Sequence, residues 1–216
     1  EAEFRIGLSY MNLEQYEQAA QQLSKLVSKE TLIVSYIDQI YYWLGEAYFH
    51  QGKYFEAIGA YQEVLSRFPD SASRIGAQYG IAWSYYEMEQ WERAVEEFEA
   101  LYNEDSTGEF ALEALFQIGD SYLNAGEYGK AELAYQRVQQ MFPDNDLTKR
   151  TEFRLGYTYY QNNENEKAIA VLNNLLASLP EESHIAIDTG EPGANEVTLA
   201  LLVETHSLLG WSYFHM

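Results

Sequence analysis

Small, apolar and aromatic positions recur along the chain at a nearly constant spacing. A small residue, preceded by Ile or Leu and followed three positions later by Tyr, occurs six times. Successive copies lie 38, 37, 37, 37 and 54 residues apart, at the pairs Gly7/Tyr10, Gly45/Tyr48, Ala82/Tyr85, Gly119/Tyr122, Gly156/Tyr159 and Gly210/Tyr213. Periods of this length indicate a repeat architecture.

The second half of each copy follows the same period. An alanine stands twelve residues after each of the first five small residues, as Ala19, Ala57, Ala94, Ala131 and Ala168. Leu, Tyr or Phe follows four residues later, on the same face of a helix. Three copies then end at a helix-breaking proline, namely Pro69, Pro143 and Pro180. Each copy is therefore predicted to be a helical hairpin, in which the small residue lets the first helix lie close to the alanine of the second.

These columns resemble the tetratricopeptide repeat family. Residues 41–71, YYWLGEAYFHQGKYFEAIGAYQEVLSRFPDS, contain its order of aromatic, Leu-Gly, Tyr, Ala, aromatic and closing Pro. The resemblance implies an all-α fold, a tetratricopeptide-type α-solenoid of antiparallel helix pairs in a right-handed superhelix. The 37-residue period and the RFPDS and MFPDN endings are similar to those of bacterial cell-envelope members, such as Tol-Pal-associated and outer-membrane-assembly lipoproteins. A periplasmic or cell-envelope location is implied, with the cytoplasm as the alternative.

The longer last step predicts an insertion. We expect five helix pairs over 1–180, an inserted loop over 181–199, and the first helix of a truncated sixth repeat over 200–216. The insertion contains Gly190, Pro192 and Gly193 and has no helical period. It lacks the alternating Asp/Asn ligands of a calcium loop, so a plain mobile loop is favoured. Because the last helix is apolar around much of its circumference, we expect the chain to be a fragment of a longer array.

Composition narrows the choice of partner. The chain has 13 Lys and Arg against 34 Asp and Glu, a net charge of −21, while 47% of its residues are hydrophobic. Nucleic acid and anionic membrane surfaces are therefore disfavoured, and an apolar or basic polypeptide is favoured. No apolar run approaches the length of a membrane span.

Motifs for catalysis are missing from the sequence. There is no cysteine, none of the four histidines belongs to a local metal-ligand cluster, and no glycine-rich phosphate loop occurs. Acidic pairs such as Glu96 and Glu97 are better explained as a solvated helix face. We expect no enzymatic activity, no cofactor and no metal.

The first helices are expected to line a concave groove rich in aromatic residues. Positions three before, one after and four after each small residue share one face. In four repeats they supply the candidate peptide-binding residues Tyr42, Glu46, Phe49, Tyr79, Trp83, Tyr86, Phe116, Asp120, Phe153, Tyr157 and Tyr160. Lys, Arg and Asn, which clamp a carboxylate in chaperone-binding relatives, are missing from the matching positions, so that activity is not expected here.

Two functions remain open. In one, the groove binds an extended or helical peptide, apolar or basic, with Trp83 and Tyr86 as the leading anchors and Tyr79, Tyr42 and Tyr157 next. In the other, the same rings pack against neighbouring repeats, and the array is a structural module that stacks on itself or on flanking repeats. Self-association through the truncated ends would then be possible.

Overall fold

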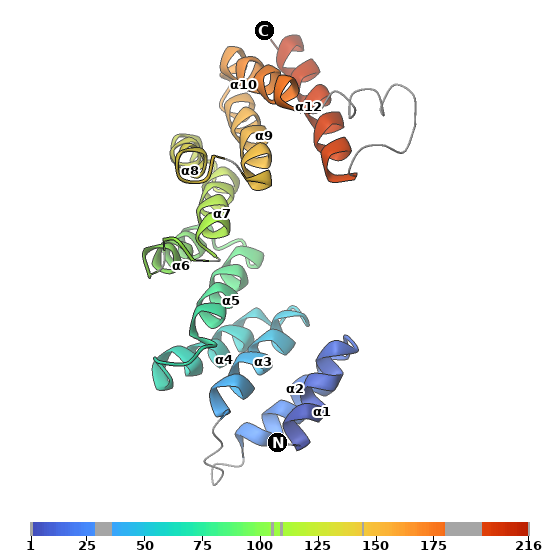
Figure 1. Cartoon of the computed structure of the whole chain (residues 1–216), viewed down its shortest axis with the longest axis vertical. Helices are drawn as coiled ribbons and strands as arrows, with labels where there is room; N and C mark the ends of the chain where they lie inside the picture. Colours follow the sequence, from blue (N-terminus) through green and yellow to red (C-terminus); the bar gives the residue numbers. More distant parts are fainter. Residues whose placement is uncertain are drawn as a thin grey trace. The chain divides into compact units, whose positions relative to one another are not determined.

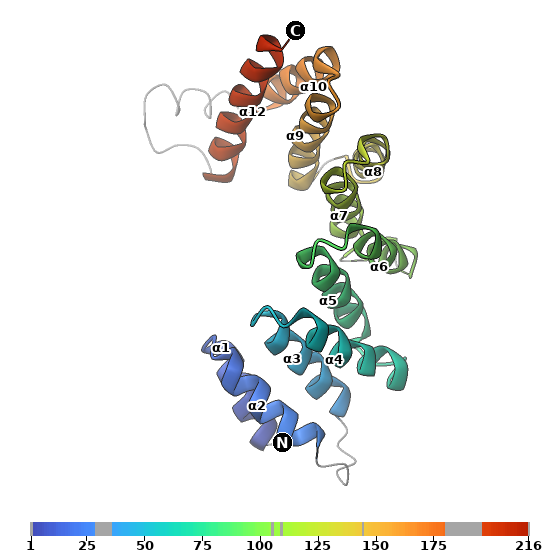
Figure 2. The same cartoon turned by 180° about the vertical axis from the view of Figure 1, so that it is seen from behind.

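The computed structural model describes residues 2–28, 36–104, 106–108, 110–143, 145–179 and 196–215. Within these ranges the chain is all-helical, and no strand is present (Figures 1 and 2). The helices are α1 (Ala2–Asn12), α2 (Tyr16–Val27), α3 (Ile37–Phe49), α4 (Tyr54–Arg67), α5 (Arg74–Glu87), α6 (Trp91–Glu104), α7 (Ala111–Asn124), α8 (Tyr128–Met141), α9 (Asp146–Gln161), α10 (Asn165–Ser178) and α12 (Glu196–Phe214).

Consecutive helices pack as pairs, which confirms the predicted fold class of an α-solenoid built from antiparallel hairpins. The turns inside the hairpins are three or four residues long. Pro69 and Pro143 lie just beyond α4 and α8, as expected of residues that end a helix. Pro180 lies outside the described residues, and the right-handed superhelix stays a prediction.

Glycine on the first helix of a hairpin allows a close approach by the second. A Cβ atom placed on Gly45 would lie 2.5 Å from Cε1 of Tyr61, and one on Gly156 would lie 2.6 Å from Cδ2 of Leu172. Both large side chains are fully buried. The glycine therefore faces the residue four positions beyond the repeat alanine, and not the alanine itself, as its nearest contact.

The five turns inside the hairpins share one backbone geometry. Each has a residue in the left-handed region, with φ between 57° and 76°, seven positions after the small residue: Glu14, Gly52, Glu89, Gly126 and Asn163. In the α3–α4 turn, the amide of Lys53 donates to the carbonyl of Tyr48 at 3.0 Å. This is the Schellman arrangement, which satisfies carbonyls at the end of the first helix.

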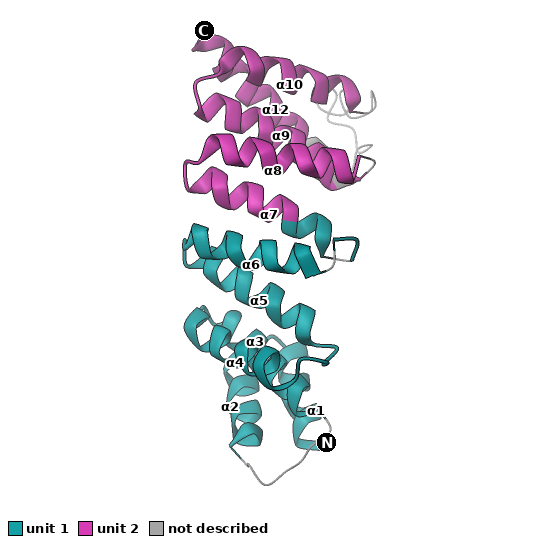
Figure 3. Ribbon diagram, turned by 90° about the vertical axis from the view of Figure 1, so that its left-hand side faces the viewer, with its two compact units in different colours: residues 1–114 teal, residues 115–216 magenta. Residues whose placement is uncertain are grey.

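The chain forms two compact units, residues 1–114 and 115–216, whose boundary lies inside α7 (Figure 3). Unit 1 has cores between α1, α2 and α3 and between α4 and α5, including Leu23, Ile40, Tyr61 and Ile81. Unit 2 buries Leu175 of α10 against Leu202 of α12. Each unit therefore has its own hydrophobic core.

The last helix, α12, starts at Glu196, whereas the sequence analysis placed its start at 200. Its inner face is buried on α10, but Trp211, Tyr213 and Phe214 are 59%, 55% and 84% exposed. The predicted inserted loop falls mostly outside the described residues, so the proposed division of the chain at 180 and 199 stays a prediction.

Candidate functional site

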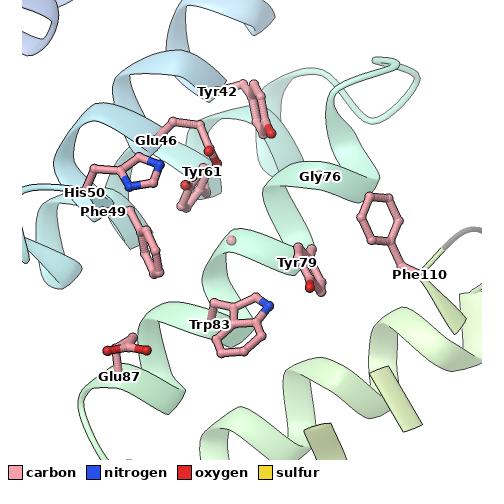
Figure 4. Close-up of a pocket in the computed structure, with 11 residues that line it drawn as sticks. Tyr42, Glu46, Phe49, His50, Tyr61, Gly76, Tyr79, Trp83, Glu87 and Phe110 are labelled. Atoms are coloured by element: carbon pink, nitrogen blue, oxygen red, sulfur yellow. Dashed lines mark hydrogen bonds between the residues drawn. The ribbon is translucent and has the colours of Figure 1, made fainter. Parts of the chain in front are cut away.

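Unit 1 contains an open pocket of about 430 Å³ between α3 and α5. Figure 4 shows α3 and α4 side chains, Glu46 and Tyr61 among them, on one side of the pocket and Tyr79, Trp83 and Glu87 of α5 on the other. The lining residues are Tyr42, Glu46, Phe49, His50, Tyr61, Gly76, Tyr79, Gly80, Trp83, Glu87 and Phe110. Five of them, Tyr42, Glu46, Phe49, Tyr79 and Trp83, belong to the predicted groove.

Aromatic rings build one wall of this pocket through contacts with one another. The ring centroid of Tyr79 lies 6.0 Å from that of Trp83 and 4.8 Å from that of Phe110. Trp83 also contacts Phe98 of the buried core, at 6.0 Å. The rings of Tyr79, Trp83 and Phe110 are half-buried, so the core holds one side of each and the other side faces the pocket.

Two carboxylates give the pocket its negative charge. Glu46 accepts a hydrogen bond from the hydroxyl of Tyr61 at 2.6 Å, and Glu87 lies near the hydroxyl of Tyr54, at 3.3 Å. Burial, followed by the nearby Glu46 carboxylate, raises the pKa of Tyr42 to about 12, and the same causes raise the pKa of Tyr61. Both phenols are therefore neutral hydrogen-bond donors at physiological pH. Among the described residues, no Lys or Arg forms an ion pair with Glu46 or Glu87.

The remaining groove candidates lie elsewhere. Tyr86 does not line the pocket, although its ring centroid lies 5.2 Å from that of Trp83. In unit 2, Phe116 and Asp120 are only 2% and 4% exposed. Burial raises the pKa of Asp120, while Arg154 and Tyr135 act in the opposite direction.

The three candidates on α9 are separate from the pocket as well. Phe153 packs against the apolar cluster that α10 and α12 share. The hydroxyl of Tyr157 accepts a hydrogen bond from Gln161, and the ring of Tyr160 lies 6.0 Å from that of His215. Five of the eleven candidates therefore line the pocket of unit 1, and a peptide-binding groove that includes the other six stays a prediction.

Several lining residues were not predicted. The sequence analysis placed Tyr61 only in the column four residues after the repeat alanine, yet its hydroxyl reaches Glu46. Gly76 and Gly80 line the pocket, and because they have no side chain the rings of Tyr42 and Tyr61 pack closely against them. The sequence offered one signal for the two glycines. Both lie outside the column of small residues that defines the repeat, so the hairpin pattern does not explain them.

The described residues offer little for other chemistry. None of their His, Asp and Glu side chains form a group of three that could hold a metal ion. Over the same ranges, no helix has the length and apolar character needed to cross a membrane.

Helix pairs joined by turns of one backbone geometry, with a glycine facing a large buried residue in four of them, define an α-helical repeat protein. Family models described as "Tetratricopeptide repeat" match residues 4–72 and 79–146, and again 151–181. The chain belongs to the tetratricopeptide repeat family. This membership supports protein–protein interaction as its general role, and proteins of the family are generally non-enzymatic scaffolds.

Solved structures share the fold at low sequence identity. A tetratricopeptide repeat protein from Parabacteroides merdae is 16% identical, with a TM-score of 0.72 over 100% of this chain and 76% of its own. MamA from Desulfovibrio magneticus RS-1 is 18% identical, with a TM-score of 0.66 over 81% and 92%. The apo form of RapI is 17% identical, with a TM-score of 0.71 over 97% and 63%. No curated protein matches the sequence.

Proposed function

We propose that the chain is an interaction scaffold that binds an apolar or basic segment of a partner protein in the pocket between α3 and α5. The observation that carries this proposal is the pairing of half-buried aromatic rings with two carboxylates in one open cavity. Aromatic side chains in desolvated pockets dominate many protein interfaces. The net charge of −21 favours a partner segment that is not acidic.

Aromatic burial is expected to supply most of the affinity. Burying a ring contributes about 1.5–3 kcal/mol, whereas an exposed ion pair contributes about 0–1 kcal/mol. The carboxylates of Glu46 and Glu87 would mainly set the choice of partner and the association rate. Salt should therefore slow association without abolishing binding.

The test begins with a random 12-residue peptide library displayed on phage and selected on the full chain. A selected peptide is then titrated against Trp83→Ala, and against Phe55→Ala as the control. Phe55 is an aromatic residue of unit 1 that is 69% exposed and outside the pocket. We expect Trp83→Ala to weaken binding at least about tenfold and Phe55→Ala to leave it unchanged.

A loss of packing inside the protein must be separated from a loss of contact with the peptide, because Trp83 also contacts Phe98 of the core. Trp83→Phe retains an apolar ring and serves as the second variant, and the melting temperature of each variant is measured before titration. Equal affinities for the wild type, Trp83→Ala and Phe55→Ala would contradict the pocket as the binding site.

A further inference from the structure

The two units contain equivalent sites at positions 74 residues, or two repeat periods, apart. Tyr42, Glu46 and Tyr61 of unit 1 correspond to Phe116, Asp120 and Tyr135 of unit 2. In both sites the tyrosine hydroxyl of the second helix donates a hydrogen bond to the carboxylate of the first, Tyr61 to Glu46 and Tyr135 to Asp120. The arrangement of an aromatic ring, an acid and a phenol is thus repeated within the chain.

In unit 2, two arginine side chains of the same chain contact the acid and the aromatic ring of this site. Nη2 of Arg154 donates to Asp120 at 3.1 Å, and the guanidinium carbon of Arg150 lies 5.5 Å from the ring centroid of Phe116. Asp120 is almost fully buried under these contacts. The unit 2 site therefore shows which cation this combination of side chains accepts.

In unit 1 the corresponding positions carry glycine. Gly76 and Gly80 stand 74 residues before Arg150 and Arg154, and both line the pocket. Glu46 keeps its bond to Tyr61, but no Lys or Arg among the described residues pairs with it. The positions that carry arginine in unit 2 therefore have no side chain in unit 1, and both border the open pocket.

We propose that the unit 1 pocket binds an arginine side chain from a segment of a partner protein. The proposal rests on the proposed function and specifies its anchor residue. A guanidinium is planar, so it stacks on rings such as Tyr42 and Trp83 while its forked N–H groups reach a carboxylate such as Glu46. Lysine offers only a compact point charge and fits such a site less well.

The probes are four blocked peptides, Ac-Ala-Ala-Xaa-Ala-Ala-amide, in which Xaa is arginine, citrulline, lysine or leucine. Citrulline has nearly the shape of arginine without its charge. Titrations of the full chain are followed by NMR. We expect the arginine peptide to bind at least about tenfold more tightly than the citrulline peptide, with lysine in between.

Two variants and a control assign the effect to the pocket. Glu46→Gln keeps an acceptor for Tyr61 and should remove the preference for arginine over citrulline, whereas Glu56→Gln, an equal charge change at an exposed position of α4, should preserve it. Gly76→Arg should place a guanidinium beside the ring of Tyr42, as Arg150 lies over Phe116 in unit 2, and so compete with the arginine peptide, because a Cβ at Gly76 lies 3.1 Å from Tyr42.

Equal binding of the arginine and citrulline peptides, tighter binding of the leucine peptide, or an arginine preference that survives Glu46→Gln would overturn the arginine anchor. So would failure of all four peptides to bind while phage-selected segments still bind through Trp83. In each case the proposed function survives if the phage-selected peptide still depends on Trp83. Loss of that dependence would refute both.

Discussion

At the residue scale, the decisive contact is that of Tyr61 with two glycines. A Cβ on Gly45 would lie 2.5 Å from Cε1 of this ring, and one on Gly80 would lie 2.5 Å from its Cζ. Because the ring cannot move away from one helix without striking the other, Gly45→Ala should lower the free energy of unfolding by about 1–3 kcal/mol. Gly59→Ala is the matched control, since Gly59 is in α4 with open space around it. It should stabilise by up to about 1 kcal/mol. Urea unfolding measures both, and a Gly45→Ala variant as stable as Gly59→Ala would show that the contact is not tight.

At the element scale, the hairpin turn is the unit that repeats most faithfully. Gly52 and Gly126 occupy its left-handed position in two repeats, but Glu89 does so in the third with φ 57°. A residue with a Cβ is disfavoured there, so Glu89→Gly should raise the free energy of unfolding by about 1 kcal/mol. Glu99→Gly, at an exposed position inside α6, should lower it by about the same amount. Thermal unfolding of the two variants should shift in opposite directions, and a loss of stability in both would count against this turn geometry.

The hairpins could be predicted from the sequence because their signals are local. Each small residue, alanine and proline has its structural role within one hairpin. Their constant spacing can therefore be recognised without knowing how the hairpins pack together. The candidate groove could be predicted only in part. Periodicity placed Phe116 and Tyr79 in the same column, but Phe116 is buried in a site that also contains arginines 31 and 35 residues after Gly119. Whether an aromatic ring is buried depends on the side chains of the next repeat, and the spacing of residues on a single helix does not contain that information.

At the scale of the whole molecule, two surfaces compete as the principal site of interaction. One is the pocket of unit 1 that contains Trp83, and the other is the exposed face of α12 with Trp211, Tyr213 and Phe214. The first supports peptide binding. The second supports the alternative function, in which the array stacks on copies of itself or on further repeats. Each surface contains a tryptophan, so one experiment can report on both.

The most direct test is a ¹⁵N NMR spectrum of the tryptophan indole N–H groups, recorded as the phage-selected peptide is added and again as the protein is diluted alone. The account predicts that the Trp83 resonance shifts in a saturable way with peptide, while the Trp211 resonance stays in place. A Trp83 resonance that does not respond to peptide, together with a Trp211 resonance that shifts with protein concentration, would contradict it and support self-assembly through α12.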